Sequence, residues 1–577
     1  MQVALKELKK HGYDLLNLVN DYKRGDITSL DNKTLVYKNI PEGLMYLINH
    51  KHNNKITFNN KLNTFGTMID VSRGAVFNIN YIKNIIRKHA LMGVNELWIY
   101  MEDIYELKKY PVFGYMRGSY SKEEIKEIVE YANLFGIEVI PAIQTLGHME
   151  QFLRWLGQTA KYKDQSNVLL ARDETTRELI YEMLKTIKEM FNTSKIHIGL
   201  DETWGFGFGT FYKKNGYVPQ IDLFLEHLNI VNDMALEVGF KDVLVWSDMF
   251  FRFFSEKNSY YDTNITFNED VISKIPKNVN LVYWDYYNKN YELVYKMLKN
   301  HLNVTEKVTF ASGTWIWSRL TYDKNKTDSY IDTHIKATID SEVKDFILTQ
   351  WMDDGAYGDH ETTMLGVFEA SYKALTKSSK INYEVYKEIN NEDYKDSVKR
   401  SLLHTTKMAQ VGMLWDDPLF SVYLNSFTNN ELENFDEILK EQKNLVNVYK
   451  NNDKFKYEYL ISSINYYKIL GRKKMLEGYF NGNIDVEDIY NKIIVNLEDL
   501  INLYRDRWYN NYKMYGLEII HSRLYLQKGR AKEMIIISKL FNKGKINKID
   551  GLTDEVAIFN EHLYEKHSLI AYTTKPH

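Results

Sequence analysis

Eight short runs rich in β-branched and aromatic residues recur between residues 64 and 351, and stretches long enough for helices separate them. The runs are TFGTMIDVS (64–72), ELWIYM (96–101), IEVIPAI (137–143), KIHIGL (195–200), DVLVWSD (242–248), NLVYWD (280–285), KVTFAS (307–312) and DFILTQW (345–351). Strands that alternate with helices pair in parallel and are covered on both faces. A β/α unit repeated eight times predicts a closed (β/α)8 barrel.

The stretches between the runs carry helix signals. In SKEEIKEIVEYANLFG, Ser121 can cap the helix with Glu124 at its third position, apolar residues recur on one face, and Gly136 supplies the stop. Shorter apolar stripes at 179–187 and 293–298 predict two further helices. The rival architecture, an open doubly wound sheet, would show a glycine-rich phosphate turn, and MIDVSRGAVFN contains no GxGxxG.

The chain of 577 residues exceeds the roughly 250 to 300 residues at which one hydrophobic core stops growing. Residues 1–60 mix one helical pattern with short apolar runs, which predicts a small N-terminal α+β segment. Residues 61–378 carry the barrel repeats. From 379 to 577 long helical patterns prevail, so we expect an all-helical C-terminal domain.

Composition excludes several classes of protein. The 74 basic and 77 acidic residues are dispersed without a basic tract, which argues against a nucleic acid partner. No apolar stretch approaches the ~18 residues of a membrane span, and no export signal is visible, so a cytoplasmic location is expected. The absence of cysteine, of HExxH and of a histidine cluster argues against a metal, and no cofactor is expected.

Acids and tryptophans follow the predicted strands, at the end of the barrel where active sites are built. Sugar rings stack an apolar face on indole and offer hydroxyls to carboxylates and guanidinium groups, so the expected ligand is a carbohydrate. Any one of these residues could instead belong to a packed rim or cap a helix. The residues are Asp70, Arg73, Glu102, Asp103, His148, Asp201, Glu202, Trp204, Trp246, Asp248, Trp284, Asp285, Tyr286, Trp315, Trp317, Trp351, Asp353 and Asp354.

The segment HIGLDETWGFG (197–207) is the most specific signal. It places Asp201 and Glu202 side by side at the predicted barrel mouth. Because adjacent carboxylates repel one another, one tends to hold a proton near neutral pH, as a general acid must. Asp-Glu pairs are also common as surface or capping acids.

HIGLDE resembles the His-x-Gly-x-Asp-Glu motif of family 20 glycoside hydrolases, the β-N-acetylhexosaminidases. DVSR (70–73) looks like the sugar-binding arginine of that family, TLGH (145–148) like its Thr-Pro-Gly-His turn, VWSD (245–248) like its fifth-strand tryptophan, and WMD (351–353) like its Trp-x-acid end. The resemblance covers about residues 60 to 370. Leu200 replaces a glycine and Leu146 a proline, which resembles a divergent branch of intracellular bacterial enzymes with a helical C-terminal region.

The resemblance implies exo-acting removal of terminal GlcNAc or GalNAc by substrate-assisted retaining catalysis. It makes Glu202 the general acid and base, and Asp201 the group that orients the acetamide. Tyr286 is favoured over Tyr283 and Tyr287 as the acetamide ligand because it follows the strand end. The remaining implied substrate contacts are Arg73, Glu102, His148, Trp246, Asp285, Trp315, Trp351 and Asp353.

Two other functions stay open. The chain could be another barrel glycosidase, in which Asp201 or Glu202 pairs with Asp285 or Glu102 as a true nucleophile. It could also be a non-catalytic carbohydrate-binding protein with a degenerate barrel. The expected partner is a glycan, and a homodimer is an open alternative to a monomer.

Overall fold

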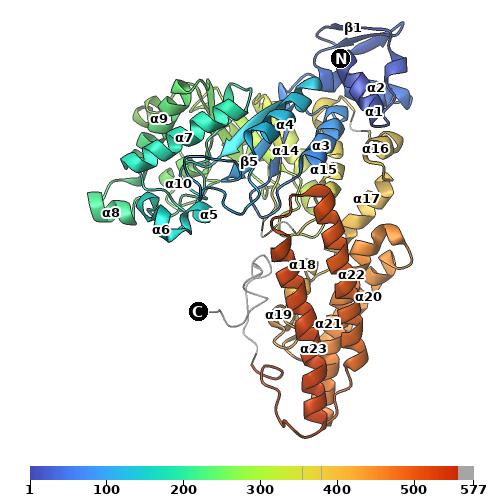
Figure 1. Ribbon diagram of the computed structural model, residues 1–577. Coiled ribbons are helices and arrows are strands. Elements are labelled where there is room, and N and C mark those ends of the chain that lie inside the picture. The colour runs from blue at the N-terminus through green and yellow to red at the C-terminus, as the bar shows by residue number, and fades with distance from the viewer. Residues whose placement is uncertain (354, 356, 379, 556–577) are drawn as a thin grey trace.

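The computed structural model describes residues 1–353, 355, 357–378 and 380–555, so Asp354 lies outside the described residues. Eight parallel strands close into a barrel in the order β10-β11-β4-β5-β6-β7-β8-β9 (Figure 1), which confirms the predicted fold class. The strands are β4 (Thr64–Asp70), β5 (Glu96–Glu102), β6 (Glu138–Ile143), β7 (Lys195–His197), β8 (Asp242–Trp246), β9 (Val279–Trp284), β10 (Val308–Gly313) and β11 (Asp345–Gln350).

Amphipathic helices cover the outside of the barrel. Helix α4 begins with the predicted capping box, in which the Ser121 hydroxyl accepts from the Glu124 N–H at 3.2 Å and the Glu124 carboxylate accepts from the Ser121 N–H at 2.8 Å. The outer helices are α3 (Ile79–Leu91), α4 (Lys122–Leu134), α7 (Glu174–Met190), α9 (Gln220–Glu237), α12 (Tyr291–Leu302), α14 (Ile331–Ser341) and α15 (Met364–Leu375). Short helices in the loops are α5 (Glu150–Leu153), α6 (Leu156–Thr159), α8 (Thr210–Asn215), α10 (Asp248–Phe254), α11 (Glu269–Ser273) and α13 (Lys324–Asp328).

The interior of the barrel is filled with side chains. Alternate residues of the strands point inward, and Trp98 and Trp246 are the largest of those that are fully buried. The inward cluster consists of Met68, Trp98, Tyr100, Ile140, Ala142, Leu244, Trp246, Val282, Ala311 and Ile347. This core fills the space between the two ends of the barrel, so the barrel is not a channel.

The N-terminal residues form a small α+β segment. Helices α1 (Gln2–Lys10) and α2 (Ile40–Lys51) flank a three-stranded sheet, in which β3 (Thr34–Tyr37) pairs parallel with β1 (Asp21–Arg24) and antiparallel with β2 (Ser29–Asp31). Helix α2 packs against α3, which attaches the segment to the barrel (Figure 1).

In the described residues that follow the barrel, the regular elements are all helices. The long helices α21 (Lys456–Asn481), α22 (Glu487–Asn511) and α23 (Leu517–Asn542) lie side by side and extend away from the barrel (Figure 1). None of the helices in the described part of the chain has the length and apolar character needed to span a bilayer. The helices are α16 (Tyr383–Asn390), α17 (Tyr394–Ser401), α18 (Gln410–Trp415), α19 (Val422–Thr428), α20 (Phe435–Tyr449), α21 (Lys456–Asn481), α22 (Glu487–Asn511) and α23 (Leu517–Asn542). The boundaries of the domains at residues 60 and 378 stay predictions.

The turn between α22 and α23 is hydrogen-bonded to the loop after β4. The Asn78 N–H donates to the carbonyl of Asn511 at 2.9 Å, and the Lys513 N–H donates to the carbonyl of Val76 at 2.7 Å. Gly516 adopts a φ of +93°, and a Cβ at this position would overlap the carbonyl oxygen of Gly74. The loop that carries Arg73 is therefore built against the helical region.

We expect Gly516→Ala to lower the thermal midpoint, because a Cβ meets both a left-handed backbone and the Gly74 carbonyl, at a cost of about 2 kcal/mol or more. The substitution should also reduce turnover by displacing the loop of Arg73. Gly529→Ala is the matched control, since Gly529 lies inside α23 with open space around its Cα. The control should melt no lower than the wild type. Equal melting of the two variants would contradict a tight joint.

Candidate active site

The paired acids follow a strand that ends early. The run 195–200 is expected to be extended, but β7 stops at His197 because Gly199 and Leu200 adopt φ values of +79° and +77°. Leu200 therefore takes, with a side chain, the left-handed conformation that glycine adopts without strain. Glu202 is also left-handed, with φ +47°, and its N–H donates to Asp248 Oδ2 at 3.0 Å. This turn places Asp201 and Glu202 at the mouth of the barrel.

Asp201 is buried and held by two side chains. Gln144 Nε2 donates to its Oδ1 at 2.7 Å, and His148 Nε2 lies 3.2 Å from its Oδ2. Burial alone would raise the pKa of Asp201, but the contacts with His148 and Gln144 lower that pKa below its usual range. Asp201 is therefore a fixed negative charge at neutral pH.

Glu202 has the opposite electrostatic environment. Partial burial and the neighbouring charge of Asp201 raise the pKa of the Glu202 carboxyl. Its side chain is 40% exposed, and its Oε2 lies 3.6 Å from His148 Nε2. Glu202 is thus the member of the pair that can hold a proton and reach a ligand.

His148 joins the two acids. Its backbone is left-handed, with φ +51°, which directs the ring between Asp201 and Glu202. Although burial opposes the charge, the carboxylate of Asp201 raises the pKa of His148 to about 9. The imidazolium therefore persists through neutral pH and compensates the paired acids.

Arg73 occupies a second polar cluster at the mouth. Its guanidinium lies 3.0 Å from carboxylate oxygens of both Glu102 and Asp353, and 3.5 Å from Asp70. Asp70 is fully buried and accepts hydrogen bonds from the N–H of Met352 and from Ser72. The cluster holds a cation with flanking carboxylates, an arrangement suited to a row of sugar hydroxyls.

Aromatic rings at the ends of β8, β9 and β11 contact one another. Trp351 Nε1 donates to the Tyr286 hydroxyl at 3.0 Å, and the ring of Trp351 lies 6.1 Å from that of Trp246. Tyr283 instead stacks behind the sheet on His301, at 4.8 Å. Among the tyrosines that the sequence left open, Tyr286 is the one placed beside Trp351.

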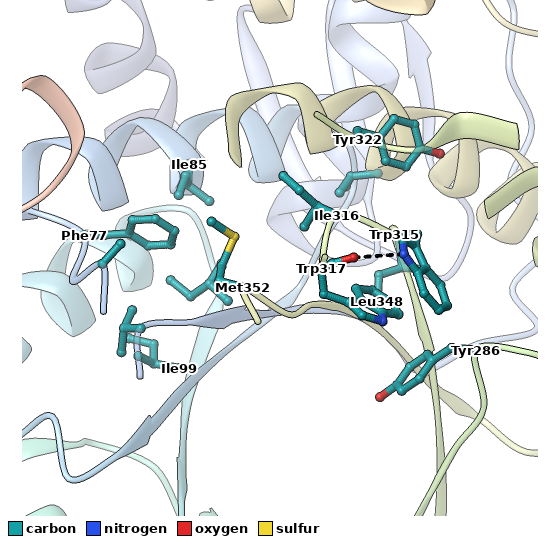
Figure 2. Close-up of a cluster of buried hydrophobic side chains, with 14 of the residues drawn as sticks. Phe77, Ile85, Ile99, Tyr286, Trp315, Ile316, Trp317, Tyr322, Leu348 and Met352 are labelled. Atoms are coloured by element: carbon teal, nitrogen blue, oxygen red, sulfur yellow. Dashed lines mark hydrogen bonds between the residues drawn. The ribbon is translucent and has the colours of Figure 1, made fainter. Parts of the chain in front are cut away.

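Two predicted contacts lie elsewhere. The structure buries Asp285 completely, and its carboxylate accepts hydrogen bonds from Tyr283, Tyr287 and Asn288, so it organises its own loop and is not presented to a ligand. The ring of Trp315 stacks on Trp317 at 4.0 Å, and its Nε1 donates to the Trp317 carbonyl (Figure 2).

It is Trp317 that meets Tyr286, edge-on at 5.1 Å (Figure 2). The ring of Trp317 therefore separates Trp315 from the ring of Tyr286. The sequence placed both tryptophans at the same strand end, but their order around the pocket depends on the conformation of the loop after β10.

Other residues enter the site without having been selected as contacts. Gln144 Nε2 contacts both Asp201 and the hydroxyl of Tyr100, and Asp248 anchors the backbone of Glu202. Burial and the charges of Asp201 and Glu202 raise the pKa of Asp248 well above its usual range. Gln144 follows the predicted strand 137–143, and Asp248 is the last residue of the predicted strand 242–248. A search of strand ends for amides as well as acids would have found Gln144.

A cavity of about 540 Å³ continues from the Arg73 cluster toward the helical region. Arg73, Glu102 and Asp353 line it on the barrel side, and Tyr515 and Arg523 line it on the side of α23. Within the described residues, no three His, Asp or Glu side chains are arranged to hold a metal ion.

The fold and this site define a glycoside hydrolase. A family model described as "Glycosyl hydrolase family 20, catalytic domain" matches residues 65–307, and one described as "Glycoside Hydrolase 20C C-terminal domain" matches residues 384–571. The chain belongs to glycoside hydrolase family 20, which confirms the predicted family and enzyme class.

Several relatives of the chain are hexosaminidases. Hexosaminidase D of Bos taurus is 26% identical over 258 residues, which are 43% of this chain and 68% of that protein. Hexosaminidase D of Homo sapiens is 26% identical over 37% of this chain and 43% of its own length. A solved β-N-acetylhexosaminidase from Bacteroides fragilis shares 16% identity, with a TM-score of 0.49, over 70% of this chain and 89% of that one. The two family models and the Hexosaminidase D relatives support the predicted hexosaminidase activity.

The placement of His148 predicts a pH effect. Its pKa rises from 6.5 to about 9 on folding, so its contribution to stability is full below about 6.5 and is lost as pH rises to about 9. NMR of histidine-labelled protein should show one ring that titrates near pH 9, absent from His148→Asn. The stability of the wild type should fall more steeply over this range than that of the variant. Absence of any ring titrating above pH ~7.5 would contradict the assignment.

Proposed function

We propose that the protein removes terminal N-acetylhexosamine from glycans by substrate-assisted hydrolysis. The observation that carries the proposal is the pair Asp201 and Glu202, with pKa values displaced in opposite directions, beside the rings of Trp246, Trp351 and Tyr286. Such a pair supplies one proton donor and one permanent anion at the same pH.

In the proposed first step, Glu202 protonates the glycosidic oxygen while the 2-acetamido oxygen of the substrate attacks the anomeric carbon. The glycosidic bond breaks, and a cyclic oxazolinium forms with the electrons of the acetamide. Glu202, now ionised, then takes a proton from water, which opens the ring at the same carbon. The raised pKa and the partial exposure of Glu202 support this role.

Asp201 would accept the acetamido N–H and balance the positive charge that develops in the ring. Gln144 and His148 hold its carboxylate in place, so little reorganisation accompanies the reaction. The Tyr286 hydroxyl would donate to the acetamido oxygen, and Trp246 and Trp351 would exclude water from the oxazolinium.

Arg73 and Asp353 would bind the hydroxyls at the non-reducing end of the terminal sugar, and Glu102 would orient Arg73. This arrangement supports exo action. The choice between GlcNAc and GalNAc, the cytoplasmic location and a homodimer stay predictions.

The geometry supports the alternative with a carboxylate nucleophile less well. Asp285 is sealed behind its own loop, and Glu102 is paired with Arg73, so neither carboxylate is presented as a free nucleophile. A covalent adduct trapped with a 2-fluoro sugar that lacks the acetamide would favour that alternative over substrate assistance.

Glu202→Gln should lose about 10²-fold or more in kcat on a natural disaccharide, because the leaving sugar needs a proton. The loss should be much smaller on a glycoside with an acidic phenol as leaving group. Steady-state kinetics on the two substrates measures the difference. Equal losses would remove the assignment of Glu202 as the acid.

Asp201→Asn should lose about 10²-fold in kcat with a smaller change in ground-state binding, since the charge acts on the developing cation. N-acetylglucosamine thiazoline, a mimic of the cyclised intermediate, should inhibit the wild type strongly and the variant weakly. Plain glucosides should be turned over negligibly by both. A comparable rate on the plain glucoside would overturn substrate assistance.

A further inference from the structure

Two residues at the rim of the site have no role in the mechanism above. Trp204 lies two residues after Glu202, and its N–H donates to the carbonyl of Glu202 at 2.7 Å. Trp204 is nevertheless 52% exposed, which is unusual for a residue with so large an apolar side chain. The guanidinium carbon of Arg252 lies 4.0 Å from the centre of this ring.

Helix α10 fixes Arg252 relative to the catalytic pair. The first residue of the helix, Asp248, accepts the N–H of Glu202, and Arg252 lies four residues later on the same face. Helix α10 therefore contacts the segment 202–204 twice, through Asp248 at the N–H of Glu202 and through Arg252 at the ring of Trp204. Arg252 is held at a defined place beside Glu202.

Arg252 differs from Arg73 in its partners. No ion pair or hydrogen bond joins its guanidinium to the described residues, and its contact is with the face of Trp204. A guanidinium that stacks on an aromatic face keeps its N–H edge available to an oxygen ligand. The nearby acids Asp201 and Glu202 would otherwise repel an anionic group at this rim.

A row of rings connects this rim to the sugar pocket. Tyr260 lies edge-on to Trp204 at 6.0 Å and to Trp284 at 5.5 Å, and Trp284 stacks on Tyr286 at 5.5 Å. The leaving group must lie on the side of Glu202, the group that protonates it. An exposed indole at that side offers the apolar face on which a sugar ring stacks.

We propose that Trp204 and Arg252 form the subsite for the leaving sugar and that this subsite favours a sugar with an anionic group, either a carboxylate or a phosphate. This inference rests on the proposed function. Trp204 supplies the stacking face, and Arg252 supplies a cation whose N–H edge meets the anionic oxygens.

The test uses three disaccharides with the same β-linked N-acetylhexosamine and the same linkage. The second sugar is glucose, glucuronic acid or glucose 6-phosphate, so that only the group at C6 changes. We expect kcat/KM of the wild type to be about five to ten times higher on the acidic disaccharides than on the neutral one at low ionic strength. The ratio of glucuronate to phosphate distinguishes the two anions.

Arg252→Gln should reduce this ratio to about one, Arg252→Lys should keep part of it, and added salt should lower it in the wild type. Arg505→Gln is the matched control, because Arg505 lies on α22 and bonds to Asn502. Its ratio should equal that of the wild type. Thermal melts of all variants exclude misfolding as the cause.

Equal kcat/KM on acidic and neutral disaccharides by the wild type would overturn the inference, as would an Arg252→Gln variant that keeps the preference or loses all three substrates equally. An aryl N-acetylhexosaminide separates this result from the proposed function. If the wild type hydrolyses the aryl glycoside without the preference, only the subsite assignment fails. If the wild type does not hydrolyse the aryl glycoside, the proposed function itself fails.

Discussion

Closure of the barrel between β11 and β4 is the pairing on which the site depends. These strands lie almost 300 residues apart in the chain, yet they pair in register from Asp345 with Thr64 to Gln350 with Ile69. Closure places the residues after β11 against those after β4, so Asp353 reaches Arg73 and the N–H of Met352 reaches Asp70. The carboxyl ends of the strands, where this fold builds its active sites, therefore carry the polar residues of the site.

The two central acids show how neighbouring residues acquire different chemistry. Asp201 points into a polar socket made by Gln144 and His148, whereas Glu202 leaves the same turn toward the open mouth. The left-handed backbone at Leu200 and Glu202 creates this divergence, and the Asp248 carboxylate holds it in place. Strain at a turn is acceptable where the surrounding contacts determine its conformation.

The strands and the catalytic pair were predictable because both depend on local patterns. Period and strand length located the eight runs, and HIGLDE marked the acids. The residues that hold the acids in place could not be predicted in the same way. Gln144 lies 57 residues from Asp201 in the chain and carries no charge, so no local pattern links the two. The sequence also did not predict which of these residues are buried. Asp285 and Trp315 follow strands as expected, but the loop conformation turns Asp285 inward. The ring of Trp317 lies between those of Trp315 and Tyr286.

The contact of Gly74 with Gly516 makes the helical region a structural part of the sugar site. The loop of Arg73 is hydrogen-bonded to a turn more than 400 residues away in the chain, whereas the partners of Asp201 and Glu202 come from loops of the barrel. Fluctuations that open the turn between α22 and α23 would release Arg73 while the acids stay in place. The enzyme would then bind its substrate less tightly while the rest of the chain is still folded, and inactivation by heat would precede global unfolding.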